Sequence, residues 1–264
     1  MTVVSSNYPS PTYWPNKVVA AVWASLVFLS MIVWLAQSIR TRFHPRRIVI
    51  LVLVSHVAMF TELIIRATSN ILRVKSQLAY ALMSGLYTIA QRTLIIGNYA
   101  LLSECLQYKT RRVRIVFIAI GIGNVLGDLT MAIAGFFSFQ SHLISLSFLF
   151  RQLSTSIVCF VTLVFYPICW WTRKWSNMSH QTIALLIVSS LSAAAIALFL
   201  LLMSIPMNYA IINDDEQWFY YCQALPIWIA LAAWNGLYPR RNLRTANQPI
   251  IKNDQFEIAL DYRF

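Results

Sequence analysis

Charged residues are scarce in this chain. They make up 11% of its 264 residues, whereas a soluble domain carries about 25%. Because 58% of the residues are hydrophobic, a water-soluble protein of this length would have too little polar surface to cover its core. The composition therefore excludes an ordinary cytosolic enzyme, a disordered chain and a free nucleic-acid-binding protein, although the formal net charge is +12.

Motifs for nucleotides, metals and cofactors are also missing. The sequence contains no Walker loop, no glycine-rich dinucleotide turn, no Cys-x-x-Cys and no His-x-x-x-His. Its four histidines are scattered along the chain, so their spacing supports no metal site. We therefore predict no metal, no cofactor and no nucleotide partner. Glycine is rare as well, with 7 residues, and a bundle with so few glycines lacks the broken helices of many transporters.

Long apolar runs are what the sequence has in place of these motifs. A transmembrane helix needs about 20 apolar residues, and seven runs reach that length. They cover residues 18–39, 48–71, 77–103, 113–139, 143–171, 182–208 and 217–238. We predict an all-α polytopic membrane protein in which residues 1–246 form a single seven-helix bundle and residues 247–264 a short cytosolic tail. The lipid bilayer is its first predicted partner.

Lysine and arginine are distributed unevenly between the predicted loops. They gather after the first, third and fifth runs and in the tail, whereas the loops on the other side carry only Lys17, Arg73 and Lys75 and an acidic run at 214–216. Because cytosolic loops are the basic ones, we place the N-terminus outside or in a lumen and the C-terminus in the cytosol. The sequence does not distinguish the endoplasmic reticulum from the plasma membrane.

Five ionisable residues fall inside the predicted spans, where each is costly. They are Glu62, Arg66, Arg92, Asp128 and Arg151. Glu62 and Arg66 are four residues apart and can pair on one helix face. We expect the five side chains to converge inside the bundle at mid-bilayer depth, as a functional site. The alternative interpretation is that they are structural pairs that fix the register of the helices.

A membrane-embedded cyclase would use such a site. Cyclisation of a lipophilic isoprenoid or meroterpenoid-type substrate needs an acid that protonates an epoxide or alkene, a dry pocket and aromatic faces for the carbocation. Asp128 and Glu62 are the candidate acids, and Asp128 is the better donor because Arg66 can hold Glu62 ionised. The candidate substrate-binding residues are Arg66, Arg92, Arg151, Tyr99, Asn124, Gln223 and Trp234.

Several short stretches together resemble one known family. They are Tyr8-Pro9-Ser10 with Asn16, Gln37-Ser38-Ile39-Arg40, Glu62 with Arg66, Asp128 with Gly135, residues 216–221 with Ala224-Leu225-Pro226, and Tyr238-Pro239. In these positions the chain resembles the fungal lipid-translocating exporters, a family of seven-helix membrane proteins. The resemblance implies a seven-helix fold and movement of an amphipathic lipid. The chain departs from the family at Gln223, where the family has an aspartate, and around residues 204–206.

Three functions follow from these observations. The first is an enzyme of secondary-metabolite biosynthesis, a cyclase that acts on a lipophilic small molecule by acid-initiated carbocation chemistry. The alternative is a transporter or flippase of an amphipathic lipid, in which the arginines bind a headgroup and the acids are counter-charges or proton carriers. The third is a receptor or scaffold without chemistry. The missing family residues and the scarcity of glycine favour the cyclase over the transporter.

Overall fold

The computed structural model describes residues 16–68, 77–106, 111–175, 178–212 and 215–237. Within these ranges the chain is helical and contains no strand. The helices are α1 (Lys17–Arg40), α2 (Arg46–Thr68), α4 (Gln77–Cys105), α5 (Arg111–Phe137), α6 (Ile144–Trp175), α7 (His180–Met203), α8 (Pro206–Ile212), α9 (Gln217–Phe219) and α10 (Leu225–Gly236). The predicted tail at 247–264 and the motifs at 8–10 and 238–239 lie outside the described residues.

Five helices in the described ranges are long and apolar enough to cross a membrane. They are α1, α2, α7, residues Ile115–Phe137 of α5 and residues Ile144–Lys174 of α6. This finding fits a multi-pass membrane protein, and the described residues confirm the prediction of an all-helical fold with several long apolar helices. The outward faces of these helices carry exposed leucine, isoleucine, valine and phenylalanine side chains, as contact with lipid requires.

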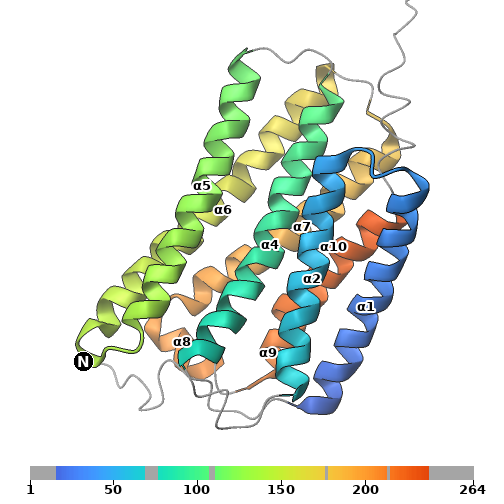
Figure 1. Cartoon of the computed structure of the whole chain (residues 1–264). Coiled ribbons are helices and arrows are strands. Elements are labelled where there is room, and N and C mark those ends of the chain that lie inside the picture. Colours follow the sequence, from blue (N-terminus) through green and yellow to red (C-terminus); the bar gives the residue numbers. More distant parts are fainter. Residues whose placement is uncertain (1–15, 69–76, 107–110, 176–177, 213–214, 238–264) are drawn as a thin grey trace, which may run out of the picture.

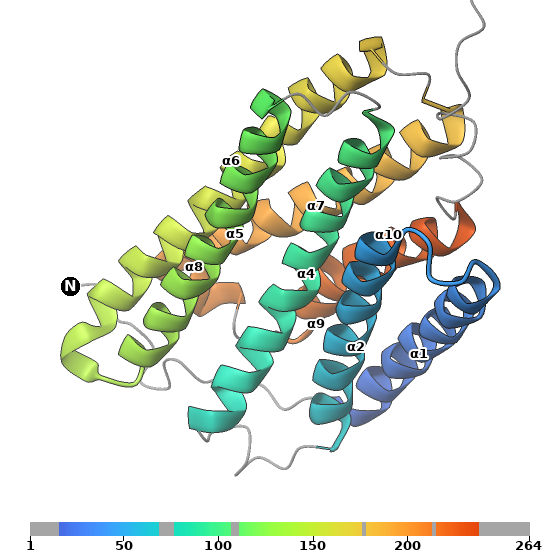
Figure 2. The same ribbon diagram turned by 45° about the horizontal axis from the view of Figure 1, so that its top comes forward.

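The helices form a bundle in which neighbours in sequence are mostly neighbours in space. Helices α1, α2 and α4 pack side by side, and α5 pairs with α6 at the opposite side of the bundle (Figure 1). Helix α7 packs against α6 and α10, and lies between these two groups in both views (Figure 2). Helix α5 packs mainly on α6 and less extensively on α4. A seam between α4 and α5 therefore separates two parts of the bundle.

Two buried tryptophans join four helices in the core. Trp34 of α1 and Trp234 of α10 meet edge to face with ring centroids 6.3 Å apart. The indole of Trp34 donates to the carbonyl of Val49 on α2 at 3.2 Å, and that of Trp234 donates to Ser189 Oγ on α7 at 3.1 Å. Both indoles therefore have the hydrogen-bond partner that a buried tryptophan needs, and the pair fixes α10 against α1, α2 and α7.

The sixth predicted span is shorter than the sequence indicates. We expected it over residues 182–208, but α7 ends at Met203 and a separate helix, α8, begins at Pro206. Proline has no backbone N–H and its ring disfavours helical geometry at the residue before it. The helix therefore stops at Ser204, whose hydroxyl donates to the carbonyl of Leu201 at 2.6 Å.

The last helical segment is not one regular helix either. Between α9 and α10 the residues Tyr220–Ala224 form a π-helical turn, η2. In a regular α-helix the ring of Pro226 would clash with the carbonyl of Cys222. A wider turn relieves this clash, and it places both Phe219 and Tyr220 in the core. Such π-turns occur often at functional sites.

Candidate functional site

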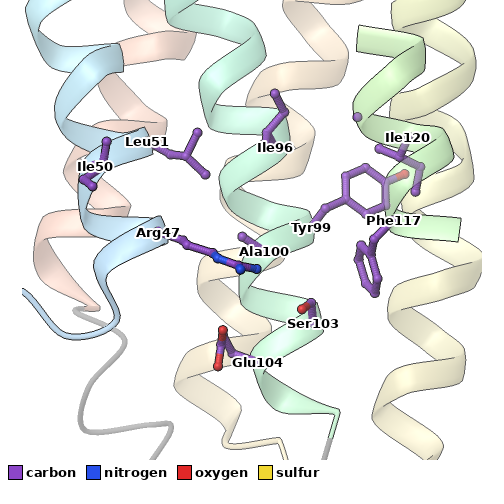
Figure 3. A pocket seen from close by; sticks show the side chains of 11 residues that line it. Arg47, Ile50, Leu51, Ile96, Tyr99, Ala100, Ser103, Glu104, Phe117 and Ile120 are labelled. Atoms are coloured by element: carbon purple, nitrogen blue, oxygen red, sulfur yellow. The ribbon is translucent and has the colours of Figure 1, made fainter. Parts of the chain in front are cut away.

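A groove lies between α2, α4 and α5. Its volume is about 420 Å³, and the side chains that line it are drawn in Figure 3. They are Arg47, Ile50 and Leu51 of α2, Ile96, Tyr99, Ala100, Ser103 and Glu104 of α4, and Phe117, Ile120 and Gly121 of α5. The groove follows the seam where α5 leaves α4, because the less extensive packing there leaves space between the helices.

The two ends of the groove differ in chemistry. Arg47 begins α2 and Glu104 nearly ends α4, so both charges and the Ser103 hydroxyl gather at one end, as Figure 3 shows. The other end is lined by aliphatic side chains, and the rings of Tyr99 and Phe117 form the wall on the side of α5. An apolar cavity with a few polar groups at one place is the usual form of a small-molecule site. This one matches an amphipathic molecule with a charged head.

The walls of the groove are fixed by contacts behind them. Tyr99 donates its hydroxyl to the carbonyl of Val161 at 2.6 Å, so it presents only its ring to the groove. That ring meets Phe117 edge to face with centroids 6.0 Å apart. At Gly121 no atom lies within 4 Å of the position a Cβ would take. The empty volume therefore reaches the backbone of α5, and a side chain at this position would enter it.

An ion pair between a buried arginine and a half-exposed aspartate joins α4 to α5. Arg92 Nε lies 2.7 Å from Asp128 Oδ1, and its side chain is 4% exposed whereas that of Asp128 is 43% exposed. The guanidinium also donates to the carbonyl of Asn124 at 2.7 Å and to Ser154 Oγ of α6 at 3.0 Å. Ser154 in turn donates to the carbonyl of Gly127 at 2.7 Å. Arg92 thus connects its own helix α4 to α5, through Asp128 and Asn124, and to α6, through Ser154.

Gly127 lets the Arg92 guanidinium lie against the backbone of α5. A Cβ at this position would collide with Arg92 Nη1 and would come within 3.2 Å of its Cζ. The residue is therefore a glycine because the guanidinium occupies the space of a side chain. Arg151 lies one helical turn before Ser154 on α6 and is buried, with its Cζ 5.3 Å from the centre of the Tyr209 ring.

A second ionic cluster lies where α2, α4 and the end of α9 meet. Arg66 Nη2 is 3.1 Å from Glu62 Oε1, and the Arg66 Cζ lies 3.5 Å from the centre of the Phe219 ring. The Tyr87 ring meets the same Phe219 ring with centroids 6.5 Å apart. Both Glu62 Oε2 and the Tyr87 hydroxyl are buried without a hydrogen-bond partner. Buried polar atoms without a partner are rare and need an explanation.

Comparisons with protein-family models, with curated proteins and with solved structures find no match to this chain. The function is therefore argued from geometry and from the sequence. Within the described ranges no group of three His, Cys, Asp or Glu side chains is placed to hold a metal ion. The chemistry that these ranges do offer consists of carboxylates, guanidinium groups, hydroxyls and aromatic rings.

The predicted site residues do not form one site in the structure. It brings Arg92 to Asp128 and to the backbone of Asn124, and Glu62 to Arg66, in two clusters with separate partners. The Asn124 side chain donates to the carbonyl of Ile120 on its own helix. Two other predicted ligands contact α7: Trp234 bonds to Ser189, and Gln223 Nε2 lies 3.8 Å from Met203 Sδ. Tyr99 is the predicted substrate-binding residue that lines the groove, and the proposed roles of all these residues stay predictions.

Several residues of the groove were not singled out as site residues by the sequence. Arg47 belongs to a basic cluster that indicates topology. Nothing in the sequence shows that it also lines a groove. Glu104 and Phe117 sit near the ends of predicted spans, where charges and aromatic side chains are common. Outside the groove, Gly127 differs from the other glycines of α5 in that a side chain here would collide with a guanidinium of another helix. None of these roles is visible in a single sequence.

Proposed function

We propose that this protein binds an amphipathic lipid in the groove between α2, α4 and α5 and moves it across the bilayer. The observation that carries the proposal is the shape and lining of the groove, which has a volume of about 420 Å³, apolar walls and opposite charges at one end. The resemblance to the fungal lipid-translocating exporters points to the same class of function. Transport thus replaces the cyclase as the first proposal, because the groove gives it a place for a substrate.

The proposed topology has seven spans with the N-terminus outside or in a lumen. Beyond the five apolar helices, α4 has 29 residues and is about 43 Å long at the usual rise per residue. Residues 217–236 are about 30 Å long by the same measure, which is the thickness of the hydrocarbon core. Both segments pack among the five. With the basic loops in the cytosol, Arg47 and Glu104 face the cytosolic leaflet.

Labelling of introduced cysteines tests this topology. Arg46 and Asp215 are both exposed and lie at opposite predicted sides. In sealed cells, a membrane-impermeant maleimide is expected to label Asp215→Cys, and to label Arg46→Cys only after the membrane is opened. The unchanged chain gives the background from its own four cysteines. Labelling of Arg46→Cys in sealed cells would reverse the orientation and would move the groove to the other leaflet.

The rim of the groove indicates the kind of headgroup. Arg47 presents a guanidinium, which binds phosphate oxygens well, and Glu104 presents a carboxylate for an ammonium group. Within the described ranges the two side chains form no ion pair with each other. Both charges therefore remain available to a ligand that carries phosphate and ammonium together. We propose a zwitterionic phospholipid, whose acyl chain would lie along the aliphatic walls.

A bulky side chain in the groove is expected to stop transport. Gly121→Phe would place a ring in the empty volume, because no atom lies within 4 Å of the Cβ position. The initial rate of fluorescent phospholipid translocation in proteoliposomes should fall at least about tenfold, which corresponds to about 1.4 kcal/mol. Gly135→Phe is the matched control, since this glycine of α5 has equally open surroundings and does not line the groove.

Replacing the charged residues at the rim of the groove tests headgroup recognition in the same translocation assay. Arg47→Gln should slow every phosphate-containing lipid, and Glu104→Gln should slow only those whose headgroup carries an amine. Arg46→Gln removes a neighbouring exposed arginine that is not part of the lining, so it controls for the loss of basic charge. Equal rates for Gly121→Phe and the unchanged protein would refute the groove as the lipid path.

The cyclase remains a second candidate because of one observation. Glu62 Oε2 and the Tyr87 hydroxyl are unpartnered beside the Phe219 ring, and an acid among aromatic rings is what carbocation chemistry uses. Asp128, in contrast, has to leave Arg92 before it can donate a proton. Membranes that convert an epoxidised prenylated phenol to a cyclised product, and lose this activity with Asp128→Asn or Glu62→Gln, would favour the enzyme. No observation favours the receptor or scaffold.

A further inference from the structure

Glu62 is the most deeply buried carboxylate in the described ranges whose environment leaves one oxygen free. Its side chain is 1% exposed, and only Oε1 has a partner, Arg66 on the next turn of α2. Oε2 has none. The ionisable groups around it are Arg66 from α2, Tyr87 from α4 and, beside Tyr87, Cys222 from the π-helical turn. Arg66 thus binds one oxygen of the Glu62 carboxylate, and the other oxygen accepts no hydrogen bond.

A proton would neutralise the buried charge of Glu62. A buried carboxylate that lacks hydrogen bonds on one oxygen is unfavourable, whereas the protonated acid carries no charge. Tyr87 is 5% exposed, and its hydroxyl is the second unpartnered polar atom of this cluster. Two buried oxygens without partners, one on α2 and one on α4, therefore lie in the same cluster, and the carboxylate is the one that can take up a proton.

The cluster also touches the least regular helical turn of the bundle. The Arg66 guanidinium lies on the ring of Phe219, the residue directly before the π-helical turn. A proton on Glu62 removes the negative charge that holds Arg66. The contact between the guanidinium and the Phe219 ring then loses the ion pair behind it, next to the turn at Tyr220–Ala224. Protonation at one carboxylate is thereby linked to the packing of the last helical segment.

The cluster is separate from the groove. Glu62 follows Arg47 by fifteen residues on α2, which corresponds to roughly 22 Å along the helix axis. In the proposed orientation Arg47 lies at the cytosolic face, so Glu62 lies in the outer half of the bilayer, where the hydrocarbon core is about 30 Å thick. A lipid headgroup at the rim therefore does not contact Glu62. Glu62 can therefore affect a lipid at the rim only indirectly, by changing how the helices pack against one another.

We propose that Glu62 binds a proton from the outer aqueous phase and that the release of this proton to the cytosol drives lipid movement. The inference rests on the proposed lipid transport. The proton adds to Glu62 Oε2, the Glu62–Arg66 ion pair loses its negative member, and the same O–H bond breaks when the proton leaves on the other side. No electron is transferred. The carboxylate, Arg66 and Tyr87 form the coupling site, and the groove forms the lipid site.

Infrared spectroscopy tests the proton site without lipid transport. In membranes of the purified full-length protein, acidification should produce the carbonyl stretch of a buried carboxylic acid. This band should be absent in Glu62→Gln and present in Glu104→Gln and Asp128→Asn. Because Glu62→Gln leaves Arg66 buried beside a neutral partner, Glu62→Gln with Arg66→Met serves as a second variant that removes both charges. A band that persists in both variants would overturn the proton site.

Transport under a pH gradient tests the coupling. Proteoliposomes that are more acidic on the outer face should translocate fluorescent phospholipid faster than vesicles without a gradient. The double variant should lose this acceleration. A gradient response that persists in the double variant, or one that a sodium gradient produces equally, would overturn the inference.

The two proposals fail in different ways. Lipid translocation that ignores the pH gradient in the unchanged protein would overturn the coupling and would leave the proposed transport intact. A Glu62-dependent infrared band in a protein that moves no lipid would overturn the transport and the coupling together, while the proton-binding carboxylate would be supported.

Discussion

Replacing Gly127 by alanine is expected to destabilise the protein by about 2–4 kcal/mol, within the range for broken buried ionic and hydrogen-bonded contacts. The added methyl group would occupy the place of Arg92 Nη1. A flexible arginine would simply move away, but this guanidinium is held by Asp128, by the carbonyl of Asn124 and by Ser154. It can move only if it gives up these partners inside the bundle.

The midpoint of thermal unfolding in detergent measures this effect. The control is Gly135→Ala on the same helix, where no atom lies within 4 Å of the new Cβ. Alanine has the better helix propensity, so Gly135→Ala is expected to leave the midpoint unchanged or to raise it. Equal midpoints for the two variants would mean that the Arg92 guanidinium does not lie against Gly127, and the proposed packing of α4 on α5 would be wrong.

Removing Arg92 alone should cost more than removing the whole ion pair. Arg92→Met leaves the half-exposed Asp128 charged and without its guanidinium. It also removes the donor of the Asn124 carbonyl and Ser154 Oγ, and each buried group left without its hydrogen bond costs about 1–3 kcal/mol. In Arg92→Met with Asp128→Leu both charges are gone, and apolar residues replace them. Most of the lost stability should then return, because buried ion pairs contribute little beyond well-packed apolar groups.

The same thermal measurement on the two variants separates a structural pair from a functional one. A structural role predicts recovered stability and unchanged lipid translocation in the double variant. If the double variant folds as well as the unchanged protein but moves no lipid, Arg92 and Asp128 belong to the transport path. If the double variant is no more stable than Arg92→Met, the hydrogen bonds from Arg92 to Asn124 and Ser154 carry the stability instead.

The long helices of this bundle could be predicted from hydropathy because each is a long, mostly apolar run between polar segments. The start of α1 at Lys17 and of α7 at His180 lie within two residues of the expected positions, and Asn16 and Ser179 cap them with side-chain oxygens. The end of α7 and the π-turn before α10 were not predicted. Both depend on how Pro206 and Pro226 are accommodated, which a hydropathy window does not measure.

The candidate site could be predicted only in part. The i,i+4 spacing of Glu62 and Arg66 indicates a pair on one helix, and the structure contains it. The Arg92–Asp128 pair joins two helices, so its partners follow from the packing of α4 on α5 and not from spacing. The groove is still less visible in the sequence, because it is the space that α5 leaves when it packs on α6. Its residues look like ordinary core and interface residues.

Helix α5 presents an unusual surface to the hydrocarbon. Asp128 is seven residues from Gly121, so both lie on nearly the same side of the helix, about 10 Å apart along its axis. The half-exposed carboxylate cannot be solvated by acyl chains, and groups of this kind draw water inward and thin the adjacent leaflet. We therefore expect the bilayer to be wetter and thinner beside this helix than elsewhere around the protein, with the deepest point of water entry at Asp128, beyond the apolar end of the groove.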